Sequence, residues 1–114
     1  MKTSNETGSK QYTRYENRLL IKVLRPNRPV KQLDFIILRV YPRRIIYSEN
    51  YSGSVAAECG RDETSLVGIV LWNEQIDNIR IGDVVRFESG WCQMRDGELI
   101  VSTGVNGKLR IIDR

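Results

Sequence analysis

The pattern of hydrophobic and polar positions predicts a series of short β-strands with almost no helix. Six runs rich in β-branched and aromatic residues occur at 33–41, 55–59, 66–72, 84–95, 98–102 and 108–112, and 45–47 resumes the first of them after Pro42. Polar turns containing Gly, Asn, Asp or Pro separate these runs. The link from Asn73 to Arg80 suits a single helical turn capped by Asn73. Five or six strands with one short helix indicate a small all-β barrel or sandwich.

Alternation along the run 66–72 separates two faces. With Ile69 and Leu71 directed toward the core, Val70 and Trp72 face the other way. An outward tryptophan leaves a large apolar ring uncovered. Such a ring on a basic protein suggests a flat partner, and nucleic-acid bases are the commonest flat partner.

The run 84–95 changes its core-facing parity part-way along. Phe87 marks a core face, and Cys92 and Met94 share that face only if the register slips by one residue. Ser89-Gly90 is a natural place for a β-bulge, which bends a strand and helps to close a small barrel. This curvature, together with the single helical link, favours a barrel over a sandwich.

The same slip places three side chains on the outer face of this run, namely Trp91, Gln93 and Arg95. They lie beside Trp72 if the two strands are neighbours. The outer face of the run 98–102 would then form the floor of the same surface, through Ile100 and Ser102.

Length and composition indicate one folded domain of ordinary globular type. Residues 1–18 are polar without a hydrophobic period, so we predict a flexible tail there and a folded domain over 19–114. No apolar run approaches the roughly 20 residues of a membrane span, and the N-terminus lacks the apolar core of a signal peptide. We therefore expect a monomer in the cytoplasm or nucleoid, or in the nucleus of a eukaryote, with no membrane partner.

The chemistry-bearing residues give little support to catalysis. The chain has no histidine and only two cysteines, Cys59 and Cys92, which excludes a histidine base and an ordinary Cys/His zinc site. Both cysteines lie in strand-like runs, where a free buried thiol is commoner than a disulfide. Asp62-Glu63 is a carboxylate pair, but adjacent turn residues do not face each other across a substrate. We expect neither enzymatic activity nor a cofactor.

Positive charge is concentrated in the first part of the chain. Residues 1–44 hold eleven Lys and Arg against three acids, a net charge of +8, and the remaining seventy residues carry −4. A basic half suits one-sided binding of a polyanion, although solvated surface charge accounts for the excess equally well.

Several side chains are candidates for contacts to a nucleic-acid strand. Three arginines near the bend at Pro42 would neutralise phosphates along a groove, namely Arg39, Arg43 and Arg44. Arg86 is a weaker candidate because Glu88 on the same strand can pair with it. Tyr51 at the tip of the first hairpin is a ligand candidate, whereas Tyr47 is expected to pack at the hairpin base.

Five short motifs resemble those of simple single-stranded-DNA-binding proteins in order and spacing. They are Leu24-Arg25-Pro26-Asn27, Asp62-Glu63-Thr64, Leu71-Trp72, Ile81-Gly82-Asp83-Val84-Val85 and Gly90-Trp91. The resemblance covers roughly residues 21–112 and is to the short OB-fold type of the crenarchaeal proteins and of the human sensor-of-single-strand-DNA complex. It implies a five-stranded OB-fold barrel with a short helical link between strands 3 and 4, similar to the OB-folds of replication protein A.

The resemblance also implies where bases bind. In that family the positions of Trp72 and Trp91 carry aromatics that stack on successive bases. A further aromatic usually follows four residues after the second, where this chain has Arg95. A guanidinium can stack on a base or pair with a phosphate.

These expectations converge on binding of single-stranded DNA with little sequence preference, in replication, recombination or repair. Two alternatives stay open. One is an RNA-binding OB module, because stacking platforms read RNA equally well. The other is an OB subunit of a larger replication or repair complex that acts mainly through protein contacts.

Overall fold

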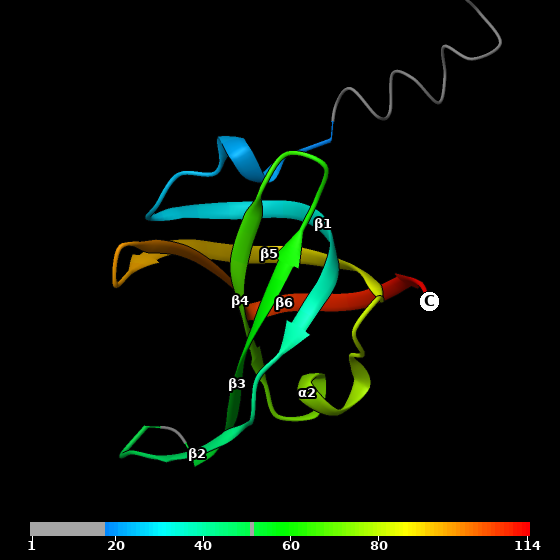
Figure 1. The fold of residues 1–114 in the computed structure, drawn as a ribbon. Helices are drawn as coiled ribbons and strands as arrows, with labels where there is room; N and C mark the ends of the chain where they lie inside the picture. The colour runs from blue at the N-terminus through cyan, green and yellow to red at the C-terminus, as the bar shows by residue number, and fades with distance from the viewer. Residues whose placement is uncertain (1–17, 51) are drawn as a thin grey trace, which may run out of the picture.

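The computed structural model describes residues 18–50 and 52–114, apart from the side chains of 104–106, and shows a sheet that closes on itself (Figure 1). The elements are η1 (Ile21–Val23), β1 (Arg28–Val40), β2 (Arg44–Tyr47), β3 (Ser52–Arg61), β4 (Leu66–Trp72), α2 (Glu74–Asn78), β5 (Val84–Arg95) and β6 (Glu98–Asp113). The strand order is β1-β5-β6-β4-β3-β2, and an additional β1–β3 pairing closes the barrel. The predicted all-β OB-type barrel is confirmed, with its short helix between β4 and β5, the third and fourth strands of the prediction.

The core fills the inside of this barrel and one of its ends. Phe35 and Phe87 meet edge to face at its centre, with ring centroids 5.0 Å apart. Ile76 of α2 and Ile79 behind it join the same buried cluster, so the helix covers an end of the barrel (Figure 1). Within the described residues, no helix is long and apolar enough to span a bilayer.

The predicted bulge in β5 is confirmed. The β5–β6 register shifts between Glu88 and Gly90, and Ser89 has a φ of 61°. A Cβ on Gly90 would lie 2.7 Å from the carbonyl oxygen of Ser102, so only glycine allows the strands to approach this closely. Beyond the slip Cys92 is buried and Trp91 is 41% exposed, as the parity argument requires.

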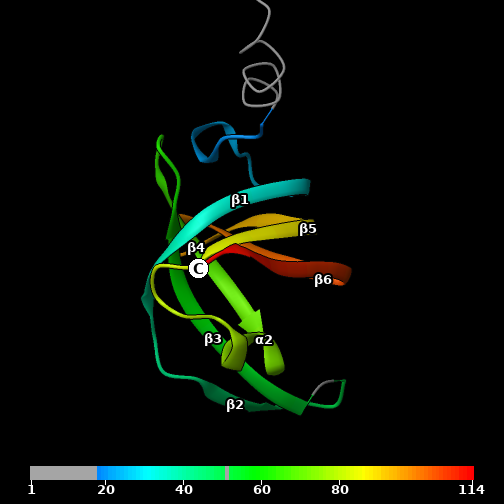
Figure 2. The ribbon, with the colours of Figure 1, turned by 90° about the vertical axis from the view of Figure 1, so that its right-hand side faces the viewer.

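Three local expectations need correction. Met94 is 51% exposed, because it lies next to the hairpin turn, beyond the last buried position of β5. The two runs 98–102 and 108–112 are one strand, β6, which continues past the shifted register. β1 begins at Arg28 instead of residue 33, because its first residues pair with β5 (Figure 2).

Both cysteines are free thiols, as predicted, although only one is fully buried. Cys92 has no exposed surface, and burial raises the pKa of its thiol. Cys59 is half-buried on β3. Among the described residues no group of three or more Cys, Asp or Glu side chains could hold a metal ion.

The Asp62 carboxylate fastens the chain before β1 to the turn between β3 and β4. It accepts hydrogen bonds from the backbone nitrogens of Ile21 (2.8 Å), Thr64 (2.7 Å) and Ser65 (3.1 Å), and from the Thr64 hydroxyl (2.6 Å). Burial raises the pKa of Asp62, but these hydrogen bonds outweigh it and lower the pKa below its usual value. The Asp-Glu-Thr motif therefore has a structural role.

Two predictions fall at or beyond the limits of the described residues. Residues 1–17 of the predicted tail and Tyr51 lie outside them. Arg18, the last residue of that predicted tail, pairs with Glu63 in the β3–β4 turn, and Leu19 packs against the core. The described chain thus contacts the barrel from Arg18 onward.

Candidate nucleic-acid interface

Strand register aligns the predicted outer-face residues in rows across the barrel. In the first row Trp91 on β5 lies opposite Ser102 on β6, which lies opposite Val70 on β4 and then Ala57 on β3. On its other side Trp91 lies opposite Pro29 of β1. Directly opposed residues project from the same face of a sheet, so this row crosses five strands on the outer surface.

A second row runs parallel to the first. Gln93 on β5 lies opposite Ile100 on β6, which is followed by Gly68 on β4 and Cys59 on β3. Arg39 ends this row, because it pairs with Cys59 where β1 closes the barrel. The register therefore brings Gln93 and Arg39 onto one continuous surface, although they come from distant parts of the chain.

Trp72 begins a third row, on the other side of the first. It lies opposite Val55 on β3, which lies opposite Arg44 on β2. Trp72 and Trp91 are thus two strands and one row apart, about 12 Å between Cα atoms by standard strand spacings. They form two separate platforms, each able to stack with its own base.

Two adjoining cavities of about 460 and 620 Å³ follow these rows, and together we call them the groove. Five residues line both cavities: Tyr41, Ala57, Val70, Arg95 and Ile100. Trp72, Gln93 and Ser102 line the smaller cavity. The floor is thus largely apolar, as base stacking requires, and Trp91 stands beside it next to Ser102.

Three of the predicted arginines remain available to a ligand. Arg44 and Arg95 line the groove, and Arg39 is exposed at the end of the second row. None of the three forms an ion pair with another described residue. An unpaired guanidinium is well suited to bind a phosphate, because its planar donors fit two phosphate oxygens.

The other two arginines are engaged elsewhere. Arg43 forms an ion pair with Asp77 of α2. Arg86 donates two hydrogen bonds to Asp34, of 2.8 and 2.9 Å, because these residues lie directly opposite in the β1–β5 register. The expected pairing of Arg86 with Glu88 is replaced, since Glu88 binds an arginine of β6. Neither Arg43 nor Arg86 lines the groove.

The tyrosines differ from expectation. Tyr47 is 81% exposed, so it does not pack at the hairpin base, where the β2–β3 pair extends away from the barrel (Figure 1). Tyr41, which the sequence did not single out, lines both cavities and is 45% exposed. Its backbone nitrogen donates to the Ala57 carbonyl at 3.1 Å, which fixes it beside the groove floor.

Gln75 positions Trp72, a role that the sequence analysis missed. The Gln75 side chain accepts a hydrogen bond from the Trp72 nitrogen (3.0 Å) and donates one to the Thr103 hydroxyl on β6 (3.2 Å). The Asn73 side chain does not cap α2 as predicted, because its Oδ1 accepts from the Ser54 nitrogen (3.1 Å). Both contacts hold the end of β4 against its neighbouring strands.

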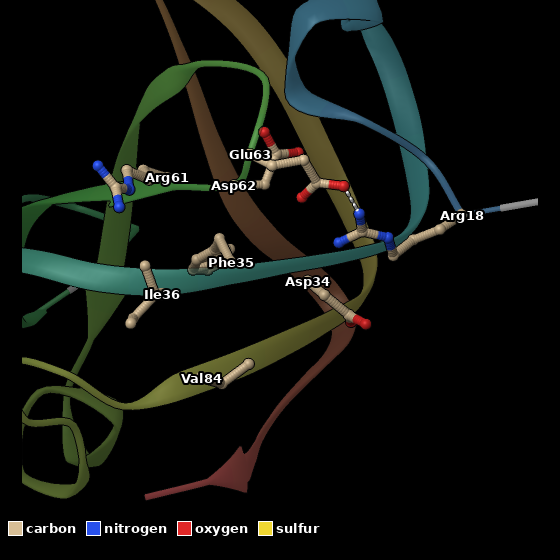
Figure 3. Close-up of a pocket in the computed structure, with 8 residues that line it drawn as sticks. All are labelled: Arg18, Asp34, Phe35, Ile36, Arg61, Asp62, Glu63 and Val84. Atoms are coloured by element: carbon tan, nitrogen blue, oxygen red, sulfur yellow. Dashed lines mark hydrogen bonds and ion pairs between the residues drawn. The ribbon is translucent and has the colours of Figure 1, made fainter. Parts of the chain in front are cut away.

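A further cavity of about 270 Å³ lies at the β3–β4 turn (Figure 3). It is lined by Arg18, Asp34, Phe35, Ile36, Arg61, Asp62, Glu63 and Val84. Its three acids outnumber its two arginines, and Arg18 is paired with Glu63. Its one aromatic, Phe35, is buried in the core and offers no face to a base, which leaves the groove with its exposed aromatics as the candidate interface.

Comparison with known proteins agrees with this geometry. No protein-family model matches the sequence. The single-stranded DNA binding protein Ssb of Saccharolobus solfataricus is 26% identical over 86 residues, which are 75% of this chain and 58% of that protein. The chain thus spans less than two thirds of this relative's length.

Solved structures with the same fold come from several archaea. The second OB-fold domain of replication protein A from Methanococcus maripaludis has a TM-score of 0.70 and 22% identity, covering 85% of this chain and 96% of that one. The OB domain of Ta0387 from Thermoplasma acidophilum has a TM-score of 0.71 and 18% identity, covering 84% and 87%. The chain is therefore an OB-fold domain, similar in sequence to the Ssb protein and in structure to OB domains of replication protein A.

Proposed function

We propose that this domain binds single-stranded DNA as a monomer and with little sequence preference. Bases stack on Trp72 and Trp91, while Arg39, Arg44 and Arg95 contact the phosphates. The observation that supports this most strongly is the placement of two tryptophans in neighbouring rows beside an apolar groove. A domain of this kind would protect or present exposed strands in replication, recombination or repair.

The energetics suit a moderate affinity. Stacking contributes about 1–3 kcal/mol per base, so two platforms supply roughly 2–6 kcal/mol. Micromolar binding requires about 8 kcal/mol, and phosphate contacts contribute the rest at low salt. Every base offers a stacking face, and the only amide or hydroxyl side chains of the first and second rows are Gln93 and Ser102, so sequence readout is expected to be weak.

A fluorescence-anisotropy competition tests this proposal. A labelled dT oligomer of about 15 nucleotides should bind with micromolar or tighter affinity at low salt. The three arginines of the interface by themselves contribute about −2 to the slope of the logarithm of the association constant against that of salt concentration. Unlabelled duplex DNA should compete poorly, since its bases are not available for stacking.

Three other outcomes would change the assignment. Stronger competition by oligo-U than by oligo-dT would make this an RNA-binding module. Equal competition by duplex DNA would show that charge alone drives binding. Absence of binding at low salt would contradict the proposal and favour a protein partner for the groove.

A further inference from the structure

The first half of β1 lies beside Trp91 and carries exposed cations. β1 lies beside β5 (Figure 2), and Pro29 is directly opposite Trp91, so these two residues share the outer face. Arg28 is directly opposite the buried Cys92, so its side chain leaves the other face of β1, at the edge of the sheet where it is exposed. Lys31 is diagonal to Trp91, a relation that places Cβ atoms about 7–8 Å apart. Arg28 and Lys31 are both exposed.

This part of the chain is positively charged without interruption. Residues 19–33 contain four cations and no acid: Lys22, Arg25, Arg28 and Lys31. In the described part of the protein, none of these four forms an ion pair. The acids that follow are already neutralised, since Asp34 binds Arg86 and Glu88 binds Arg110. Asp62 lies against the η1 end of the segment, at Ile21, whereas Arg28 and Lys31 have no ion-paired carboxylate among the described residues.

Along β5 beyond Trp91 the charge is different. There the β5–β6 hairpin presents Arg95 together with the exposed carboxylates of Asp96 and Glu98. Two carboxylates beside one guanidinium repel a second phosphate more than they attract it. A strand that leaves the groove over Trp91 is thus attracted more strongly toward β1 than along β5 to the tip of the hairpin.

We propose that single-stranded DNA leaving Trp91 crosses Pro29 and continues onto the first half of β1, where Arg28 and Lys31 bind its phosphates. This inference rests on the proposed function and extends the interface beyond the groove. The sequence alone predicts phosphate contacts at the other end of β1, near Arg39. In the barrel both ends of β1 border the binding surface, because β1 pairs with β5 at its start and with β3 at its end.

The test compares two double variants that remove the same charge. Arg28→Ala/Lys31→Ala removes the proposed contacts, whereas Arg61→Ala/Arg80→Ala removes two exposed arginines that do not line the groove. With a dT oligomer of about 15 nucleotides, the first variant should lose about 25-fold in affinity at 0.1 M salt, and its salt slope should fall by about 1.4. The control should lose less than about twofold, and neither should lose affinity for a dT oligomer of about 5 nucleotides, which spans the tryptophans alone.

The outcomes separate this inference from the proposed function. Wild-type affinity of Arg28→Ala/Lys31→Ala for the longer oligomer, with weakened binding by Trp72→Ala, would overturn the β1 path and leave the groove in place. Equal losses on both oligomers would show that Arg28 and Lys31 act only through long-range electrostatic attraction. That result would also overturn the β1 path. If the wild-type protein binds neither oligomer, both proposals fail. Lys31→Glu, with its fold checked by thermal unfolding, should lose more affinity than Lys31→Ala on the longer oligomer only.

Discussion

Replacing Trp72 by alanine is expected to weaken binding of oligo-dT by about 5- to 150-fold, the equivalent of one base stack of 1–3 kcal/mol. Trp72 ends β4 on the outer face and lines the groove. Its peptide nitrogen donates to the Gln75 side chain, and the next residue, Asn73, accepts a hydrogen bond from Ser54 of β3. The ring is therefore held in position for stacking before a base binds. Isothermal titration at low salt measures the loss directly.

The matched control is Trp72→Phe, which keeps an aromatic face and should retain most of the affinity. Trp91→Ala should produce a loss of similar size. Because the two tryptophans are about 12 Å apart, their effects should add to within roughly 0.5 kcal/mol in a double-mutant cycle. Unchanged affinity in Trp72→Ala would make this residue a wall of the groove and not a stacking platform.

The second large effect concerns Glu58, on β3 inside the barrel. Its side chain shares the inner face with Ala56 and Gly60 and is 2% exposed. Neither carboxylate oxygen has a hydrogen-bond partner among the residues that the structure describes. Burial without compensation raises the pKa of Glu58 from 4.5 to about 7.

The raised pKa makes the stability of the fold depend on pH. The folded state holds the Glu58 proton more tightly than the unfolded chain does. The bound proton therefore adds its full contribution to the free energy of unfolding below pH 4.5, and this contribution is lost as the pH rises to about 7. The loss in the free energy of unfolding amounts to about 3 kcal/mol. Glu58→Gln carries no such proton, so at pH 8 it should be the more stable protein.

Urea unfolding of the wild type and Glu58→Gln between pH 5 and pH 8 measures this effect. The difference between the two free energies should change steadily across the window and level off above about pH 7.5. Subtracting the variant removes the contribution of the other carboxyls. A difference that stays constant with pH would show that Glu58 is ionised in the folded protein at all these values.

Period-two alternation explains the parts of the fold that the sequence predicted well. Ile69 and Leu71 are buried and Trp72 is only half-buried, as expected of a strand with one face on a core. The parity change in β5 located the bulge at Ser89 because a single slip reverses every side chain that follows.

Pro29 shows why a strand start was missed. Proline usually ends a strand, because it has no N–H to donate to a neighbour. At Pro29, however, β1 pairs with β5 alone, since its pairing with β3 is confined to Ile36 and beyond. The strand is an edge at this point, and edge strands tolerate proline.

The detailed chemistry of the site depends on contacts between distant residues, which no local pattern encodes. Arg86 and Asp34 are 52 positions apart, and Gln75 and Thr103 are 28 apart. Sequence alone could not tell that Arg86 is engaged or that Gln75 supports Trp72. The inward position of Glu58 likewise follows from the register of β3 with β4, where Glu58 lies opposite Ile69.

The most direct test of the account is a fluorescence titration of two single-tryptophan proteins, Trp72→Phe and Trp91→Phe, with oligo-dT at low salt. If both platforms stack on bases, the remaining tryptophan of each protein should be quenched, and both titrations should saturate at similar oligomer concentrations. Added salt should reverse the quenching as phosphate contacts weaken. Unchanged fluorescence in both proteins at low salt would contradict the central claim that Trp72 and Trp91 bind single-stranded DNA.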